Sequence, residues 1–137
     1  MPKRLTDGEF AALARFRAAM RGYFHAAEVA ARDVGLTAAQ HQLLLAVRGT
    51  TPDLPPSVSE LSRSLYLKVH STMGLIARAE RAGLVHTWTD DRDARRQLVA
   101  ITAKGARLIA LLYESHKREL LGARGELLDA LRHLDER

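Results

Sequence analysis

The sequence lacks cysteine and has few aromatic residues, few prolines and no long hydrophobic run. Without cysteine the chain can have no disulfide, no cysteine-ligated metal site and no thiol redox sensor. No apolar stretch approaches the roughly 20 residues needed to cross a membrane. The basic start at residues 1–5 is not followed by the apolar segment of a signal peptide. We therefore expect a cytoplasmic protein that does not associate with membranes.

The sequence also lacks the common signatures of catalysis. No Ser-His-Asp spacing, glycine-rich phosphate loop or paired-carboxylate motif stands out, so we expect neither an enzyme nor a bound cofactor. Asp90, Asp91 and Asp93 form an acidic cluster, but a calcium loop needs further ligands and a glycine at set positions. No metal site is therefore expected. The net charge of +5 instead favours a polyanionic partner.

The middle third of the chain contains a series of helix boundaries. Residues 57–60, Ser-Val-Ser-Glu, have the pattern of a capping box and predict the start of a short helix. After a tight turn at residues 66–69, a second helix is predicted from about residue 70 to residue 82. Gly83 ends this helix, because glycine adopts the left-handed conformation without a clash. Two short helices joined by a tight turn are typical of a helix-turn-helix.

The second of these helices has an apolar side and a polar side. We expect Met73 and Ile76 to face inward, with Leu75 and Ala79 beside them. The polar side chains that remain available are Lys68, His70, Ser71, Thr72, Arg78 and Arg81. A helix that enters a DNA groove needs this division.

Two β-prone segments, residues 84–89 and 97–101, follow the second helix and predict a hairpin. The hairpin tip carries aspartates beside arginines. An arginine at such a tip can enter a narrow minor groove or contact phosphates, and the acids would hold it in place. Trp88 is expected to pack on the two helices. The predicted DNA-binding residues are Ser57, Lys68, His70, Ser71, Thr72, Arg78, Arg92, Arg95 and Arg96.

Two further helices are predicted before this region. Capping boxes begin at Thr6 and at Thr37, and the apolar periodicity that follows them ends near Gly35 and Gly49. The next segment contains three prolines, which exclude a helix and predict a surface connection. These prolines are Pro52, Pro55 and Pro56.

From residue 103 onward, leucines predict a long helix and a shorter one, separated by a weak break near Gly122. Together with the amphipathic helix in residues 1–35, these helices carry more apolar side chains than exposed helices can leave in water. We expect residues 1–35 and 103–137 to form a homodimer interface. A monomer that closes these helices on its own core is the alternative. A twofold dimer would place two recognition helices about 34–36 Å apart and favour a pseudopalindromic site.

The segment from residue 57 to residue 105 resembles a MarR-type transcriptional regulator. The resemblance rests on Ser57-Val58-Ser59-Glu60-Leu61, Leu65, Leu67, Ser71, Arg78, Gly83-Leu84-Val85, Asp90, Asp93, Arg95, Val99 and Thr102-Ala103-Lys104-Gly105. It implies a mainly α fold with a small β-hairpin, in which a winged helix-turn-helix core at residues 36–102 is flanked by N- and C-terminal dimerisation helices. It also implies a homodimeric repressor that binds double-stranded DNA and is released by a small aromatic or phenolic molecule.

Some positions depart from the family pattern. Tyr66 stands in the turn where many members have glycine, and Gly74 stands where an arginine is frequent. Gly74 indicates either a close approach of the helix backbone to DNA or a merely tolerant site. His25 and His41 lie on helices that border a cavity in the family, which makes them candidate effector-binding residues. Surface or core histidines are the alternative interpretation of both.

Two other functions are compatible with the same residues. A regulator without a small-molecule effector, or an architectural DNA-binding protein, would share the whole DNA-binding segment. A winged-helix protein-interaction module or a small enzyme would share the fold alone. Absence of DNA binding at low salt would identify this last class.

Overall fold

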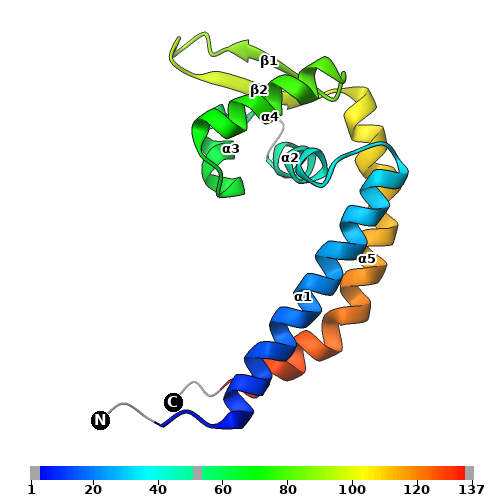
Figure 1. Cartoon of the computed structure of the whole chain (residues 1–137). Coiled ribbons are helices and arrows are strands. Elements are labelled where there is room, and N and C mark those ends of the chain that lie inside the picture. The colour runs from blue at the N-terminus through cyan, green and yellow to red at the C-terminus, as the bar shows by residue number, and fades with distance from the viewer. Residues whose placement is uncertain (1–3, 51–53, 135–137) are drawn as a thin grey trace. The chain divides into compact units, whose positions relative to one another are not determined.

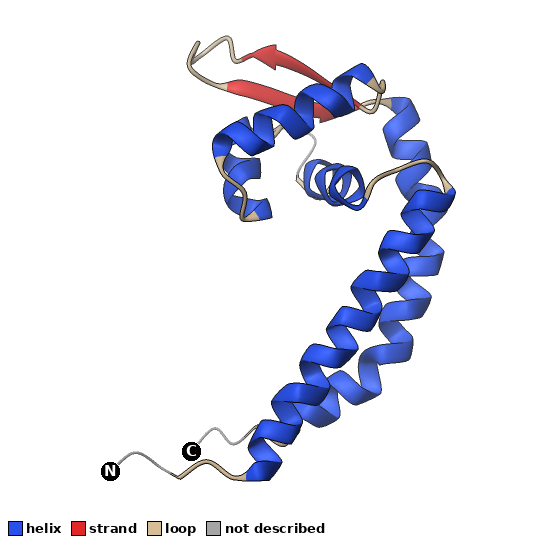
Figure 2. Ribbon diagram, in the orientation of Figure 1, coloured by secondary structure: helices blue, strands red, loops and turns tan. Residues whose placement is uncertain are grey.

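The computed structural model describes residues 4–50 and 54–134 (Figure 1). In chain order the elements are α1 (Asp7–Asp33), α2 (Ala38–Arg48), α3 (Val58–Leu65), α4 (Val69–Arg81), β1 (Val85–Thr89), β2 (Gln97–Ile101) and α5 (Ala103–Arg132). Figure 2 shows a mainly helical chain with one β-hairpin, which confirms the predicted fold class. The chain divides into two compact units, one formed by residues 31–112 and the other by the described parts of residues 1–30 and 113–137.

In the second of these units, called the helical-pair unit below, α1 packs along α5 (Figure 1). Small side chains are buried on both helices, among them Ala12 and Ala27 of α1 and Ala130 of α5. Arg15 Nη2 and Asp129 Oδ2 approach to 3.8 Å, at the exposed edge of the pair. The helices therefore pack through small residues, with an ion pair at the rim.

The predicted break near Gly122 is wrong, because α5 is a single helix of 30 residues. A glycine inside a helix costs only about 1 kcal/mol relative to alanine, and it keeps its backbone hydrogen bonds. The leucines on both sides of Gly122 continue one helical periodicity. Propensity alone is too weak to interrupt such a helix.

The core of residues 31–112, called the winged unit below, is built around α2. This helix contacts α3, α4 and β2. The largest completely buried side chains come from five elements or their ends: Leu43, Leu44, Leu61, Thr72, Leu84, Val85 and Val99. Both α4 and the hairpin pack on α2, so packing fixes the position of α4 relative to the hairpin.

Side-chain caps begin the helices where the sequence predicts them. The boxes at Thr6 and Thr37 form in both directions, each with hydrogen bonds of 2.7–3.2 Å between the cap residue and the third helical residue. At the start of α3 the box is only half formed. Ser57 Oγ accepts from the Glu60 amide at 3.2 Å, but the Glu60 carboxylate accepts from Arg96 instead of reaching back.

The hairpin joins α3 as well as α4. β1 and β2 are antiparallel, with Val85 opposite Ile101 and Thr89 opposite Gln97. An isolated bridge pairs Ser57 with Leu98, and the Val99 amide donates to the Pro56 carbonyl at 3.0 Å. The segment before α3 is thus tied to β2. Of the predicted surface connection, residues 51–53 with Pro52 lie outside the described residues, whereas Pro56 is buried.

No helix in the described ranges is both long enough and apolar enough to cross a membrane.

Candidate nucleic-acid interface

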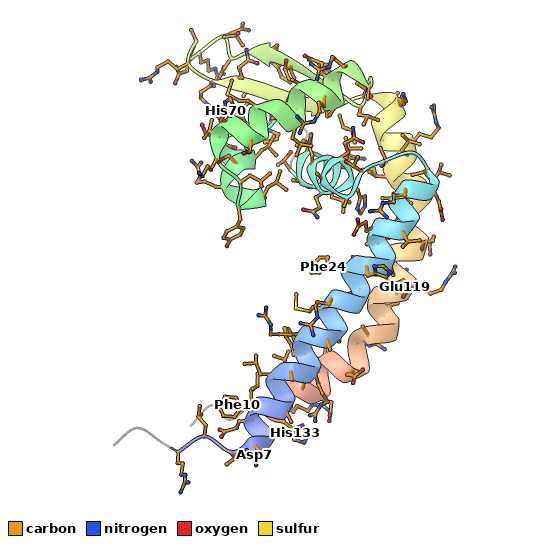
Figure 3. The ribbon with its side chains drawn as sticks, in the orientation of Figure 1. Asp7, Phe10, Phe24, His70, Glu119 and His133 are labelled. Carbon is orange, nitrogen blue, oxygen red and sulfur yellow. The ribbon has the colours of Figure 1, made fainter. Side chains whose placement is uncertain are left out.

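The helix α4 presents one buried face and one exposed face. Leu75, Ile76 and Ala79 are buried against the core. The exposed residues include Lys68, which is the N-cap, together with His70, Ser71, Arg78 and Arg81. Figure 3 labels His70 near the start of α4. Five of the predicted polar positions are therefore accessible on the recognition helix.

The predicted exposure of Thr72 and the predicted burial of its neighbour Met73 are both wrong. Thr72 is completely buried, and its hydroxyl donates to the Lys68 carbonyl at 3.0 Å. Met73, which the sequence analysis expects in the core, is 55 % exposed. The Thr72 hydroxyl is satisfied within its own helix, so its burial leaves no polar group unpaired. Its side chain has no surface to offer to DNA in this structure.

Ser57, another predicted DNA-binding residue, is also buried. Its hydroxyl caps α3, and its backbone is bridged to Leu98 of β2. Its evident role is to begin α3 beside the hairpin. A contact of Ser57 with DNA remains an untested prediction.

The turn between α3 and α4 is closed by its own hydrogen bonds. Ser62 Oγ donates to the Leu67 carbonyl, and the Leu67 amide donates to the Ser62 carbonyl, both at 3.0 Å. Tyr66 ends α3 in the left-handed region with φ 55° and ψ 39°, and its side chain is 96 % exposed. Left-handed backbone costs roughly 1 kcal/mol for a residue with a Cβ, and here no burial of the ring offsets that cost.

At the hairpin tip, Asp93 holds the side chain of Arg95. Arg95 Nε donates to Asp93 Oδ1 at 3.0 Å, and Arg95 Nη2 donates to Oδ2 at 3.2 Å. The Arg95 side chain is nevertheless 90 % exposed. The hydrogen bond from this guanidinium lowers the pKa of Asp93 below its usual value. The predicted arrangement of an acid that fixes an exposed arginine is thus present in the structure.

The other two arginines of the tip differ from each other. Arg92 is exposed, and its amide donates to Asp90 Oδ1 at 3.0 Å. Arg96 Nη2 donates to Glu60 Oε1 of α3 at 2.6 Å, and Arg96 Nη1 lies 3.8 Å from Asp90 Oδ2. Arg96 therefore links the base of the tip to α3, a contact that sequence reasoning did not foresee. Its predicted contact with DNA is untested.

The hairpin is also fixed at its other end, where β2 leads into α5. Thr102 Oγ1 donates to the Gly83 carbonyl at 2.6 Å, and Lys104 Nζ donates to the Ala82 carbonyl at 2.8 Å. Gly105 lies so close to the chain that an added Cβ would be 2.4 Å from the Leu84 carbonyl oxygen. The segment Thr102–Gly105 thus ties the end of α4 to the start of α5.

Two further expectations concern aromatic and acidic residues of the hairpin. Trp88 is 36 % exposed, and its ring stacks on His86 of the same strand with centroids 5.3 Å apart.

In the ranges that the structure describes, no three His, Cys, Asp or Glu residues are grouped as metal ligands. Asp90 and Asp93 instead accept hydrogen bonds from the hairpin tip.

The candidate effector residues lie in different surroundings. His25 is exposed on α1 in the helical-pair unit, and His41 is buried on α2 in the winged unit. His116 on α5 is buried as well, and the sequence analysis does not single it out.

A groove in the winged unit brings several of these residues together. It has a volume of about 370 Å³ and lies between the start of α3, the first turns of α4 and the start of β2. Arg63, Arg95 and Arg96 contribute to its walls, and Val69 and Met73 of α4 line it as well. Basic side chains of the hairpin and apolar side chains of α4 thus share one concave surface.

Comparison with known proteins finds similar sequences and structures. Residues 34–96 match the model of the MarR family. The transcriptional activatory protein BadR of Rhodopseudomonas palustris is 35% identical over 88 residues, which are 64% of this chain and 50% of BadR. The chain thus spans about half the length of this curated relative.

Solved structures show the same fold over most of the chain. AbsC, a MarR family transcriptional regulator from Streptomyces coelicolor, has a TM-score of 0.75 and 22% identity, covering 93% of this chain and 83% of AbsC. Sco3205 from the same organism, solved in complex with DNA, has a TM-score of 0.74 and 19% identity, with 90% and 77% covered. Bordetella bronchiseptica BpsR, whose DNA binding is regulated by 6-hydroxynicotinic acid, has a TM-score of 0.66 and 22% identity, with 85% and 92% covered.

Proposed function

We propose that the chain is a member of the MarR family of winged helix-turn-helix transcriptional regulators, whose model its residues 34–96 match, and that it is a homodimeric repressor of a pseudopalindromic operator. A small aromatic or phenolic molecule releases it from this site. On this proposal the chain is a DNA-binding regulator rather than an enzyme. We also propose that the protein is cytoplasmic.

The observation that carries the proposal is the position of Arg95. Its guanidinium is held by two hydrogen bonds to Asp93, yet it remains almost fully exposed at the hairpin tip. An arginine that is already fixed loses less conformational entropy when it enters a minor groove or contacts phosphates. The exposed side chains of α4, with His70 and Ser71 in its first turn, supply the contacts for the adjacent major groove.

The homodimer is supported by apolar surface on the helical-pair unit. Phe10 and Phe24 project from the same side of α1 (Figure 3), and both are more than half exposed. Further exposed apolar side chains of this unit are Leu13, Tyr113, Leu120, Leu121, Leu128 and Leu131. Extended apolar surface of this kind marks an interaction site in a folded protein. A second copy of the chain would cover it and give the regulator twofold symmetry.

The sign of regulation has its own test. The curated relative BadR is named an activatory protein. Repression follows when the operator overlaps a promoter, so a reporter fused to the bound site distinguishes the two cases. Expression that rises when the regulator is deleted supports repression, and expression that falls contradicts it.

We propose that His25 and His41 bind the small molecule that releases the protein from DNA. A histidine can donate a hydrogen bond to a phenolate or carboxylate, which are the polar groups of an aromatic acid. The DNA binding of BpsR is regulated by 6-hydroxynicotinic acid, a ligand of that type. His25→Gln and His41→Gln are tested separately, and thermal stabilisation by a panel of hydroxylated aromatic acids is the measurement. If no acid stabilises the protein or releases DNA, the function is a regulator without an effector.

The decisive experiment measures DNA binding of the full chain. Fragments selected from the source genome give the operator, and fluorescence anisotropy then gives Kd as a function of salt. Arg95→Ala is expected to weaken operator binding about tenfold or more and to lower the slope of log Kd against log salt by about 1. Arg107→Ala, an exposed arginine of α5, is the matched control and should change little. Unchanged affinity after Arg95→Ala combined with Ser71→Ala would refute the proposed function.

A further inference from the structure

Two apolar residues of α4 leave about half of their surface exposed. Val69 is 47 % exposed and Met73 is 55 % exposed. They are four residues apart on α4, so they lie on the same flank of the helix. Both line the groove whose walls include Arg63, Arg95 and Arg96. An apolar strip on α4 is therefore bordered by arginines and by Glu60, which accepts a hydrogen bond from Arg96.

The neighbouring residue makes this arrangement notable. Thr72 has no exposed surface, although its hydroxyl could have contacted DNA. Thus α4 buries the polar residue Thr72 and exposes its apolar neighbour Met73. Burial of Met73 in a core would contribute about 2 kcal/mol to folding, and its exposed position forgoes most of that stabilisation. A partner with an apolar group would recover this energy on binding.

The chemistry of DNA offers one apolar group on a base edge in the major groove, the C5-methyl of thymine. Hydrogen bonds cannot recognise this methyl, whereas an aliphatic side chain can pack on it. Val69 is the first residue of α4, and the N-terminal residues of a recognition helix contact base edges. The exposed arginines of the groove, Arg63 and Arg95, match the phosphates on either side of such a base.

We propose that Val69 and Met73 recognise the methyl group of thymine in each half of the operator. This inference rests on the proposed function and adds a specificity to it. The valine and the methionine thioether form an apolar contact for the methyl, while the adjacent arginines contact the phosphate backbone. The operator half-site is then expected to contain thymine at a fixed position opposite the first two turns of α4.

The test removes only the methyl group. The full chain first selects its site from random duplexes, and each thymine of that site is then replaced in turn by deoxyuridine. Base pairing is kept, so any loss reports the methyl. The expected result is one sensitive position per half-site at which affinity falls about fourfold, the factor that corresponds to one buried methyl-sized group.

The protein side of the experiment uses the double variant Val69→Ala/Met73→Ala. It should bind the thymine operator about tenfold more weakly, and it should no longer distinguish thymine from deoxyuridine at the sensitive position. Leu45→Ala, which removes a similarly exposed aliphatic side chain from α2, is the matched control. It should keep the full sensitivity. Equal thermal midpoints verify that the variants are folded.

Three results overturn the inference. The wild type could be insensitive to deoxyuridine at every thymine, or the double variant could remain as sensitive as the wild type. Either result, with specific binding retained, leaves the proposed function intact and removes the role of Val69 and Met73. If the wild type selects no specific site at all, the proposed function and this inference fail together.

Discussion

Arg96 of the hairpin donates a 2.6 Å hydrogen bond to Glu60 of α3, and this contact joins two elements that the sequence separates by 36 positions. The pair lies on the groove side of the winged unit, where both residues line the same concave surface. Both side chains are nearly half exposed, so the pair contributes at most about 1 kcal/mol to folding. Its importance lies in the position of the hairpin tip.

We expect Arg96→Ala and Glu60→Gln each to weaken operator binding about two- to fivefold, because the tip loses its link to α3. The free energy of unfolding should change by less than about 1 kcal/mol. Anisotropy titrations and urea unfolding measure the two quantities. Tighter binding by Glu60→Gln would show instead that Glu60 withholds Arg96 from DNA.

Gly105→Ala should destabilise the fold strongly. The added Cβ would lie 2.4 Å from the Leu84 carbonyl oxygen and 2.9 Å from Ile101 Cγ1, and a backbone oxygen cannot move aside cheaply. We expect a loss of about 2–3 kcal/mol in urea unfolding. Gly122→Ala in the same helix is the matched control, since a Cβ there meets nothing within 4 Å. It should stabilise the protein by up to about 1 kcal/mol.

Gly74→Ala separates the two interpretations of this glycine. In the protein itself an added Cβ would approach only Arg78 Nη1, at 3.3 Å, and that flexible side chain can move. The helix should therefore gain up to about 1 kcal/mol of stability. We expect operator affinity to fall about tenfold, because the methyl blocks close approach to DNA.

Arg78→Ala provides the control for Gly74→Ala, because it reports the effect of displacing that guanidinium alone. If both variants lose the same affinity, the loss belongs to Arg78 rather than to helix approach. If Gly74→Ala binds normally, the position is merely tolerant.

Asp93 should remain ionised at lower pH than an ordinary aspartate. Its pKa is lowered chiefly by the side-chain hydrogen bond from Arg95. A carboxyl with a lowered folded-state pKa stabilises the fold above its unfolded-state pKa, and this stabilisation disappears as the pH falls through the folded-state pKa. The hydrogen bonds between the Arg95 guanidinium and the Asp93 carboxylate should therefore persist at neutral pH and be lost only in acid below pH about 4.

An NMR titration of the Asp93 carboxyl measures this pKa, and Arg95→Ala should return it toward the ordinary value. An Asp93 pKa that does not respond to Arg95→Ala would contradict the arrangement.

The sequence predicts the elements of this fold well because their ends have local causes. Thr6, Thr37 and Ser57 each cap a helix start, and Gly83 ends α4 with φ +75° because it has no Cβ. The strands 84–89 and 97–101 are found within one residue of their predicted bounds. Such signals act over three or four residues, so no tertiary information is needed.

The errors have tertiary causes. Thr72 and Met73 are adjacent, and only the core contacts decide which of them is buried. Glu60 has the sequence of a cap residue, but an arginine far along the chain takes its carboxylate. Neither the burial of Thr72 nor the contact of Glu60 with Arg96 can be predicted from local periodicity. The segment that forms the candidate DNA-binding surface is therefore predictable from the sequence, whereas the exposure of its individual side chains is not.

The end of α4 has a consequence for how such a regulator can diversify. Its last carbonyls accept from the amides of Ala82, Gly83 and Leu84, and Lys104 donates to the Ala82 carbonyl just beyond it. Because these acceptors are occupied by the turn between α4 and β1 and by Lys104 of α5, a longer α4 would have to break the hydrogen bonds at the base of the hairpin. A change of target sequence can therefore arise from substitutions within the 13 residues of α4, but not from insertions at its C-terminal end.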